Sequence, residues 1–225
     1  MMMRYYPVNL DIRNRKCLIV GGGSVSLRKT ERLLKCGAKI SVVSPVVTER
    51  LAALADNGAI VLHKRPYRSS DINDMFLVIA ATDNEKLNRQ ISGDAKRHNI
   101  LCNIVDYPEG SDFILPSTVN RGDLQIAVST SGNSPAFAKK LRKQMENQFG
   151  EEYLVFLKLM GAIRKKLLSE EHNPEKHKLI FEQLVESDLA EMIKKKEIEK
   201  INSLLFNILG EGYDFNLLSG CDTKK

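Results

Sequence analysis

Consecutive glycines join an apolar segment to a helix-forming segment near the start of the chain. Gly21, Gly22 and Gly23 follow the apolar residues, and Ser24 and Val25 open the predicted helix. Glycines let a ligand approach the backbone closely, and the first turn of a helix offers unpaired N–H groups with a partial positive charge. Both features are suited to a pyrophosphate, so this segment predicts a dinucleotide site.

A carboxylate able to carry acid–base chemistry follows a later apolar run. Asp106 comes directly after residues 101–105, so it is expected at the lip of a ligand crevice. An aspartate before Tyr107 and Pro108 is also common in turns, and the residues alone leave both interpretations open. Asp83, by contrast, precedes a helical pattern and is predicted to cap that helix.

A second anion site is predicted in the polar loop of residues 129–134, called the 129–134 loop below. Its candidate residues are Ser129, Thr130, Ser131, Gly132 and Ser134. Ser134 and Pro135 are typical of an N-cap and the first residue of a helix, and several basic residues follow on that helix. A substrate with several carboxylates would fit this arrangement. A capped helix with a basic, solvent-exposed face explains it equally well.

The elements that must position these residues alternate between strand and helix. Strands are predicted at 17–20, 39–43, 59–63, 75–80 and 100–105, with helices at 25–35, 48–55 and 84–98. Repeated βα units with short connections imply a doubly wound parallel sheet of the Rossmann type, an α/β fold. Ligands collect at the carboxyl ends of such strands. Those ends carry residues 21–23, Ser44 and Pro45, Ala81 with Thr82 and Asp83, and the stretch from Asn103 to Asp106.

The pattern changes after Asp106. Short strands are predicted at 113–115 and 124–128, followed by a helix at 136–148. Beyond Gly150 apolar residues recur at three- to four-residue spacing, which predicts helices, and Asn173 with Pro174 separates two of them.

Composition narrows the class of protein. With 225 residues, 43% hydrophobic and 28% charged, the chain is typical of a globular protein. No run approaches the ~18 apolar residues of a membrane span and no signal peptide is evident, so a cytoplasmic location without membrane contact is expected. The net charge of +6 favours an anionic partner. The basic run at 194–196 is interleaved with glutamates and lacks aromatic residues, so nucleic acid is not the expected partner.

Cysteine and histidine give no sign of a metal site. The four cysteines form no C-x-x-C pair, and Cys17 and Cys102 lie in apolar runs that predict inert core thiols. His172 and His177 flank Pro174 in a polar stretch, which favours a loop.

The second predicted strand ends at Ser44, where an NAD site of this fold usually has an acidic residue. No arginine follows directly, as a site for the 2′-phosphate of NADP would favour. The residues alone therefore leave the choice between NAD and NADP even.

An ordered set of short motifs carries a family resemblance over residues 5 to about 150. The matching segments are YPVNL at 6–10, VGGG at 20–23 with Val25 and Arg28-Lys29, VVSP at 42–45, AATD at 80–83, NIVD at 103–106, FILP at 113–116 and AVSTSG at 127–132 with Ser134-Pro135. Together they resemble precorrin-2 dehydrogenases, the family that includes the amino-terminal half of siroheme synthase. A helical remainder is compatible with that resemblance.

The resemblance implies that NAD⁺ accepts a hydride from precorrin-2, giving sirohydrochlorin for siroheme. It assigns acid–base chemistry to Asp106. It places the nucleotide on residues 21–25 and on Ser44, Pro45 and Val46, with Ala81, Thr82 and Asp83 lining the cleft, and it favours NAD. The carboxylates of precorrin-2 would then meet Asn103 and the 129–134 loop. Some members also insert Fe²⁺ into sirohydrochlorin, and the residues do not decide this.

The resemblance also implies a division of the chain. A Rossmann domain is expected at 1–113, a small α+β dimerisation region at 114–149 and an all-helical domain at 150–225, in a homodimer. Ser26 stands where the family usually has alanine or glycine, which predicts slight crowding. No methyltransferase portion is evident in these residues. The alternative hypothesis is a non-catalytic, NAD(H)-sensing regulator.

Overall fold

The structure, a computed structural model, describes residues 4–170 and 173–220. The chain divides into two compact units, Met1–Leu115 and Pro116–Lys225, and each is described by itself. The division into three parts at 113 and 149 stays a prediction. In the part of the chain that is described, no helix combines the length and apolar character needed to cross a bilayer.

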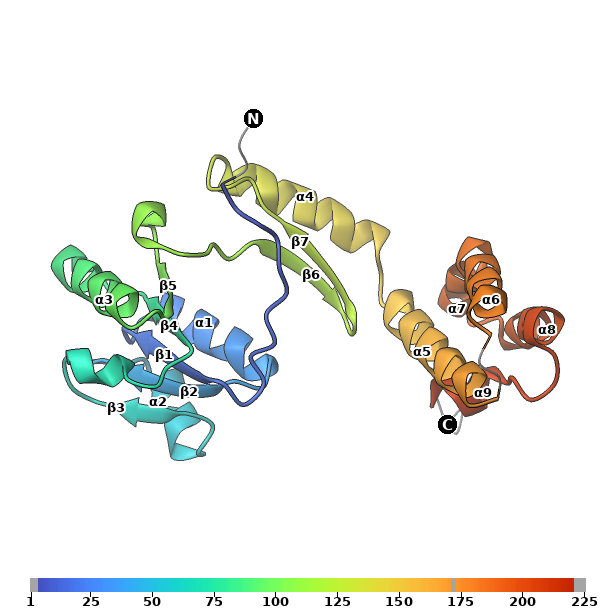
Figure 1. Ribbon diagram of the computed structural model, residues 1–225, viewed down its shortest axis with the longest axis horizontal. Helices are drawn as coiled ribbons and strands as arrows, with labels where there is room; N and C mark the ends of the chain where they lie inside the picture. Colours follow the sequence, from blue (N-terminus) through green and yellow to red (C-terminus); the bar gives the residue numbers. More distant parts are fainter. Residues whose placement is uncertain (1–3, 171–172, 221–225) are drawn as a thin grey trace. The chain divides into compact units, whose positions relative to one another are not determined.

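The first unit alternates strands and helices along the chain (Figure 1). Its elements are β1 (Lys16–Val20), α1 (Ser24–Lys35), β2 (Lys39–Val43), α2 (Glu49–Asp56), β3 (Val61–His63), η1 (Ser69–Ile72), β4 (Leu77–Ala80), α3 (Glu85–Arg97), β5 (Leu101–Ile104) and η2 (Pro108–Gly110).

The strands form one parallel sheet in the order β3-β2-β1-β4-β5. Val20 lies opposite both Val43 and Ala80, and Ala80 lies opposite Ile104. The strand order reverses beside β1, where a doubly wound sheet opens its ligand crevice. The predicted Rossmann-type fold is confirmed.

Alternate residues of each central strand pack on opposite faces of the sheet. Leu18 and Val20 of β1 join a buried cluster with Ile91 of α3. Cys17 and Ile19 join a second cluster with residues of α1 and α2. Helices therefore cover both faces, as the near-continuous apolar strands require.

Two cysteine thiols belong to these clusters. Burial raises the pKa of Cys17 to about 11 and that of Cys102 to about 12, so both stay protonated at neutral pH. The prediction of inert core thiols is confirmed. Cys36 is exposed, and Cys221 lies outside the described residues.

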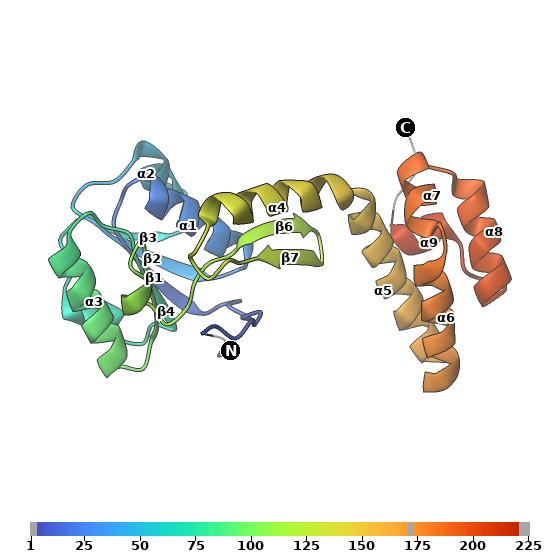
Figure 2. The same ribbon diagram turned by 90° about the horizontal axis from the view of Figure 1, so that it is seen from above.

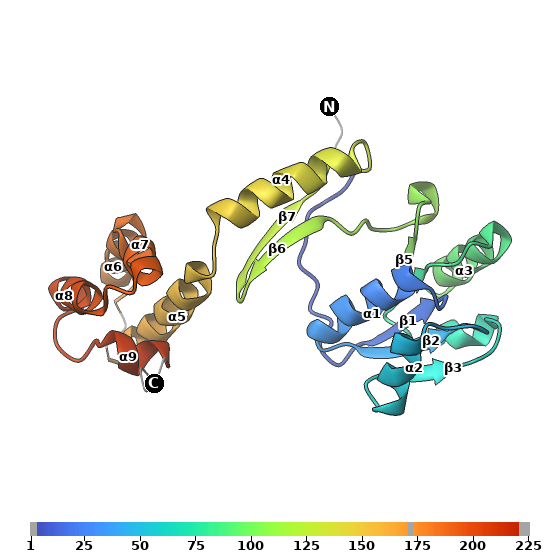
Figure 3. The same cartoon turned by 180° about the vertical axis from the view of Figure 1, so that it is seen from behind.

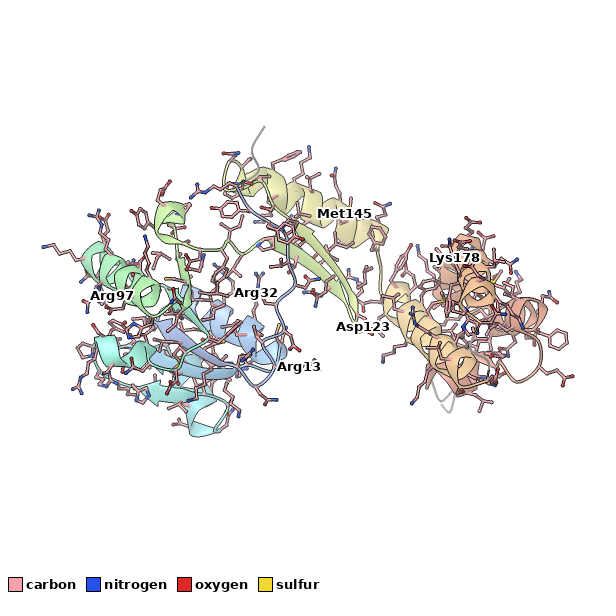
Figure 4. All side chains as sticks on the ribbon, viewed as in Figure 1. Arg13, Arg32, Arg97, Asp123, Met145 and Lys178 are labelled. Carbon is pink, nitrogen blue, oxygen red and sulfur yellow. The ribbon has the colours of Figure 1, made fainter. Side chains whose placement is uncertain are left out.

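A buried carboxylate joins α3 to the loop before η1. Asp94 is fully buried and accepts a hydrogen bond of 2.9 Å from the Tyr67 hydroxyl. Arg97, labelled in Figure 4, pairs with the same carboxylate from one turn further along α3. Burial and the Asp94 carboxylate both raise the pKa of Tyr67, which keeps its hydroxyl a donor. A buried charge is tolerated here because two donors satisfy it.

Removing the Tyr67 hydroxyl is expected to destabilise the first unit. Tyr67→Phe leaves one oxygen of a buried carboxylate without its donor, which costs about 1–3 kcal/mol of unfolding free energy. Urea unfolding measures this loss. Tyr6→Phe is the control because Tyr6 is 84% exposed, and equal midpoints for the two variants would contradict the prediction.

The second unit begins with a hairpin and a helix and continues as a group of helices (Figure 2). Its elements are β6 (Ser117–Arg121), β7 (Leu124–Val128), α4 (Pro135–Gln148), α5 (Glu152–Glu170), α6 (Pro174–Glu186), α7 (Leu189–Lys195), α8 (Ile198–Leu209) and α9 (Phe215–Ser219). The strands β6 and β7 pair antiparallel around a turn at Gly122 and Asp123, and α4 packs on both.

The predicted strand at 113–115 is wrong. These residues have no strand geometry, and the first strand after β5 begins at Ser117. The segment leading to it lies along the free edge of β5, held mainly by side chains. The Asp112 carboxylate accepts from the Cys102 N–H at 2.9 Å, and the Phe113 carbonyl accepts from the Asn103 amide at 2.9 Å. An apolar pattern cannot distinguish this arrangement from a strand.

The helices α5 to α9 surround one apolar cluster (Figure 3). Leu159, Ile163 and Leu167 of α5 lie at its centre, at the predicted helical spacing. The predicted break at Asn173 and Pro174 lies at the start of α6, where Asn173 is the N-cap and Pro174 is the first residue. The loop prediction for His177 is wrong: the residue lies buried within α6, on the same helix face as Ile180 and Leu184. His172 lies outside the described residues.

Candidate functional site

The carboxyl ends of four neighbouring strands, β2, β1, β4 and β5, are held level by backbone hydrogen bonds. The Gly21 N–H donates to the Val43 carbonyl at 3.0 Å. The Ala81 N–H donates to the Val20 carbonyl at 2.8 Å, and the Val105 N–H donates to the Ala80 carbonyl at 2.9 Å. The loops after β1, β4 and β5 therefore start from one edge of the sheet, which is called the carboxyl edge below.

The glycines at this edge have different roles. Gly21 has φ +120°, and a Cβ there would lie 2.2 Å from the Ala81 carbonyl oxygen. A Cβ on Gly22 would lie 2.0 Å from the Val46 carbonyl oxygen. Both glycines are needed by the packing of the loops themselves. Gly23 is different, because a Cβ there would meet nothing within 4 Å. The open space for a ligand lies at Gly23.

The first turn of α1 faces this space without a side-chain cap. Gly23 is the N-cap and supplies no side-chain acceptor, so the N–H groups of Ser24 and Val25 have no capping partner. Unpaired N–H groups, the positive end of the helix dipole and an open approach at Gly23 together fit a pyrophosphate.

Ser26 fills the position where crowding was predicted. Its side chain is fully buried, and its Oγ lies 3.5 Å from the Ala81 carbonyl oxygen. The hydroxyl is thus accommodated between α1 and the loop after β4.

The loop after β2 carries no charged side chain. Ser44 is buried and its hydroxyl donates to the Val46 carbonyl at 2.6 Å, which closes the turn. Pro45 is exposed and the Val46 side chain is 78% exposed. Residues 44–48 thus present an apolar, uncharged surface beside Gly22.

The loop after β4 is fixed by a residue that the sequence analysis missed. Asn88 of α3 accepts from the Thr82 hydroxyl at 2.7 Å and donates to the Thr82 carbonyl at 2.9 Å. Asn84 caps α3, so the prediction that Asp83 is the cap is wrong. Either residue fits a capping pattern, and only the helix start distinguishes them. Asp83 is exposed at the carboxyl edge.

Asp106 lies at the same edge, exposed, one residue beyond the Val105 N–H that bonds to β4. Its strand is two places from β1, which separates the loops by roughly 10 Å. Its φ of +62° is in the left-handed region that few residues other than glycine adopt.

Lys29 of α1 interacts electrostatically with Asp106. Burial, with Arg28 and Arg32 adding repulsion, lowers the pKa of Lys29, and the Asp106 carboxylate opposes that shift. In the sequence, Lys29 stands out only as part of a motif shared with the family. This electrostatic interaction depends on how α1 packs on the sheet, which the sequence pattern does not show.

Asn103 is buried, and its amide donates to the Phe113 carbonyl at 2.9 Å. This bond fixes the segment after η2. Substrate contact by Asn103 stays a prediction.

The 129–134 loop belongs to the second unit. Ser134 is confirmed as the N-cap of α4, since its Oγ accepts from the Phe137 N–H. The Thr130 hydroxyl accepts from the Ser134 N–H at 3.1 Å, and the Ser129 hydroxyl accepts from the Ser131 N–H at 3.1 Å. Ser131 and Gly132 both have positive φ. The hydroxyls keep their own protons for donation to an anion.

Residues 4–170 and 173–220 contain no group of three or more His, Cys, Asp or Glu side chains placed to hold a metal ion. A groove of about 500 Å³ lies on α8 and α9, beside Phe206 and Leu217. None of the predicted site residues lines it.

Comparison with known proteins places both units in one biosynthetic family. Residues 8–117 match the family described as putative NAD(P)-binding, and residues 121–148 match the one described as sirohaem biosynthesis protein central. A siroheme synthase from Thioalkalivibrio sulfidiphilus is 36% identical over 212 residues, 94% of this chain and 43% of that protein. One from Escherichia coli is 33% identical over 213 residues, 94% of this chain and 47% of that protein.

The chain belongs to the family that shares these two regions with siroheme synthase. It spans about half the length of these siroheme synthase relatives. A solved structure named SirC, precorrin-2 dehydrogenase, has the same fold, with a TM-score of 0.77 at 22% identity over 91% of this chain and 98% of that chain. The carboxyl edge lies in the match at 8–117, and the 129–134 loop lies in the match at 121–148.

Proposed function

We propose that the chain is an NAD-dependent precorrin-2 dehydrogenase of siroheme biosynthesis. The observation that carries the proposal is the carboxyl edge, where open space at Gly23 and the exposed carboxylate of Asp106 lie two strands apart. The family and the fold agree with this reading. They give no support to a non-catalytic NAD(H)-sensing regulator.

The N–H groups at the start of α1 would hold the pyrophosphate of the dinucleotide, and Thr82 with Asp83 would border its nicotinamide half. NAD⁺, when bound, supplies the hydride acceptor. The Asp106 carboxylate accepts the proton that the macrocycle releases as it is oxidised, so that one hydride and one proton leave together. Because Asp106 is exposed, it can pass that proton to solvent.

We propose NAD as the preferred cofactor because the family resemblance implies it, although residues 44–48 also lack the acidic residue that usually holds the NAD ribose. A 2′-phosphate is usually met by an arginine near the end of the second strand, and this turn offers neither an arginine nor a lysine. We expect kcat/KM for NAD⁺ to exceed that for NADP⁺ by at least about tenfold. Steady-state assays with both cofactors measure this ratio, and equal values would contradict it.

The substrate's carboxylates have two sources of attraction in this chain. The net charge of +6 attracts an anion at long range. The 129–134 loop, at the N-terminus of α4, offers hydroxyl donors and the positive end of a helix dipole.

A homodimer is part of the same proposal. The hairpin of β6 and β7 buries only Val119 fully, and α4 buries only Ala138, among the described residues of these elements. A two-stranded sheet is marginal by itself, so a second copy is the expected cover. Light scattering on the purified chain should give twice the monomer mass, and a monomer at micromolar concentration would contradict the dimer.

Turnover of precorrin-2 tests the function. Purified chain with precorrin-2 and NAD⁺ should form one NADH per sirohydrochlorin, seen by absorbance of both products. Absence of NADH formation with authentic substrate would refute the proposal. Adding Fe²⁺ and sirohydrochlorin to the same preparation asks separately whether the chain also inserts iron, as some of the family do.

A further inference from the structure

The turn that carries Asp106 has a conformation that needs support. The Tyr107 N–H donates to the Ile104 carbonyl at 3.2 Å, which closes a four-residue turn with Asp106 in third place. That place has φ +62°, a region that glycine adopts far more readily than aspartate. Strained backbone persists where the surroundings hold it, and such residues cluster at functional sites.

One hydroxyl holds this turn from the side. Ser111 Oγ accepts from the Ile104 N–H at 2.8 Å and donates to the Tyr107 carbonyl at 2.9 Å. The Ile104 carbonyl lies 3.3 Å from the same oxygen. Ser111 thus bonds to the residues on both sides of the Val105–Asp106 pair.

The strand edge explains why no backbone group takes this place. β5 is the last strand of the sheet, so the N–H of buried Ile104 has no neighbouring strand to bond. Without Ser111 that N–H would be an unsatisfied buried donor. The returning segment is fixed independently, because the Ser92 hydroxyl donates to the Gly110 carbonyl at 2.8 Å.

We infer that Ser111 is a positioning residue, which holds Asp106 in its left-handed turn so that the carboxylate stays at the carboxyl edge. Ser111 acts through Asp106 and touches neither substrate nor cofactor. The expected effect of Ser111 on turnover rests on the proposed function. The expected effect of Ser111 on the structure of the turn rests on the hydrogen bonds alone.

Ser111→Ala tests the effect on turnover. Because a small misplacement of a catalytic group costs much of its effect, we expect kcat to fall about 10- to 100-fold. The Kd for NAD⁺ should stay within about twofold, since the glycine loop is untouched. Ser92→Ala is the matched control, since it removes a similar bond outside the turn, and kcat should then change less than about threefold. Unchanged kcat in Ser111→Ala, or loss of NAD⁺ binding with it, would overturn the inference.

A double variant separates positioning from a general structural role. In single turnover with excess enzyme, Ser111→Ala should cost less than about threefold when Asp106→Asn is already present. An equal fall in both backgrounds would overturn the inference. Should Ser111→Ala not fold, Ser111→Thr decides instead, because it retains the hydroxyl and should keep kcat within about fivefold. A larger loss in that folded variant overturns the inference.

Amide hydrogen exchange measures the stability of the turn without depending on catalytic activity. In Ser111→Ala the N–H groups of Ile104 and Tyr107 should exchange about tenfold faster than in the parent. Unchanged exchange overturns the inference. If the parent is inactive but exchange is faster in Ser111→Ala, the proposed function is refuted. The structural role of Ser111 in the turn is then still supported.

Discussion

Asp106→Asn is expected to lower kcat for precorrin-2 oxidation about 10²- to 10⁴-fold, the usual contribution of a positioned general acid or base. Asparagine preserves the size of the side chain and tolerates the left-handed φ of this position, so the turn should remain intact. What is lost is the acceptor for the proton that leaves the macrocycle. Stopped-flow absorbance of NADH and sirohydrochlorin measures the change.

The chain offers a matched control for this substitution. Asp74 is also an exposed aspartate with a left-handed φ of +60°, but it precedes β4, at the opposite edge of the sheet. Asp74→Asn should therefore leave kcat within about twofold of the parent. The Kd for NAD⁺ should be unchanged in both variants. Full activity in Asp106→Asn would remove this carboxylate from the mechanism.

Gly23→Ala is expected to weaken NAD⁺ binding about 10- to 100-fold, the value of one charge-assisted hydrogen bond between backbone N–H and phosphate. The added Cβ meets nothing in the protein within 4 Å and fills the space left for the pyrophosphate. Because Gly23 has a negative φ of −81°, alanine fits there without strain; its weaker N-capping and the lower entropy of the unfolded chain offset one another, so the thermal midpoint should change by only about a few degrees. Isothermal titration calorimetry and thermal unfolding together separate affinity from stability.

Two further glycine substitutions serve as comparisons for Gly23→Ala. Gly22→Ala places a Cβ 2.0 Å from the Val46 carbonyl oxygen, so it should destabilise the fold itself. Gly161→Ala, in α5, adds a Cβ to open space far along the chain from the glycine loop, so it should leave affinity unchanged and should not destabilise the fold. Parental NAD⁺ affinity in a folded Gly23→Ala variant would show that the pyrophosphate binds elsewhere.

The parallel sheet could be predicted because its strands are nearly continuous apolar runs separated by helical patterns. Residues 77–80 are buried throughout, as such a run implies. The carboxyl edge followed from this, since parallel strands end together, and glycines and carboxylates come directly after them. The predicted strand at 113–115 is wrong because this segment is joined to β5 by the Asp112 and Asn103 side chains and one backbone bond, from the Asp112 N–H to the Cys102 carbonyl, and not by a strand ladder.

What the sequence could not show is which side chains support the site. Asn88 and Ser111 are ordinary polar residues in a helix and a loop, and neither stands in a recognisable motif. Their importance arises from contacts over six and seven residues that fix Thr82 and Ile104. The position of His177 could not be predicted either. The polar residues around Pro174 favoured a loop, whereas His177 is buried in a helix.

The measurement that tests the central claim most directly is a crystal structure of the chain with NAD⁺ bound. The account predicts the pyrophosphate against the N–H groups of Gly23, Ser24 and Val25, with the nicotinamide directed along the carboxyl edge toward Asp106, about two strand spacings or roughly 10 Å from the glycine loop. A dinucleotide bound away from Gly23, or one whose nicotinamide points toward β3, would contradict it.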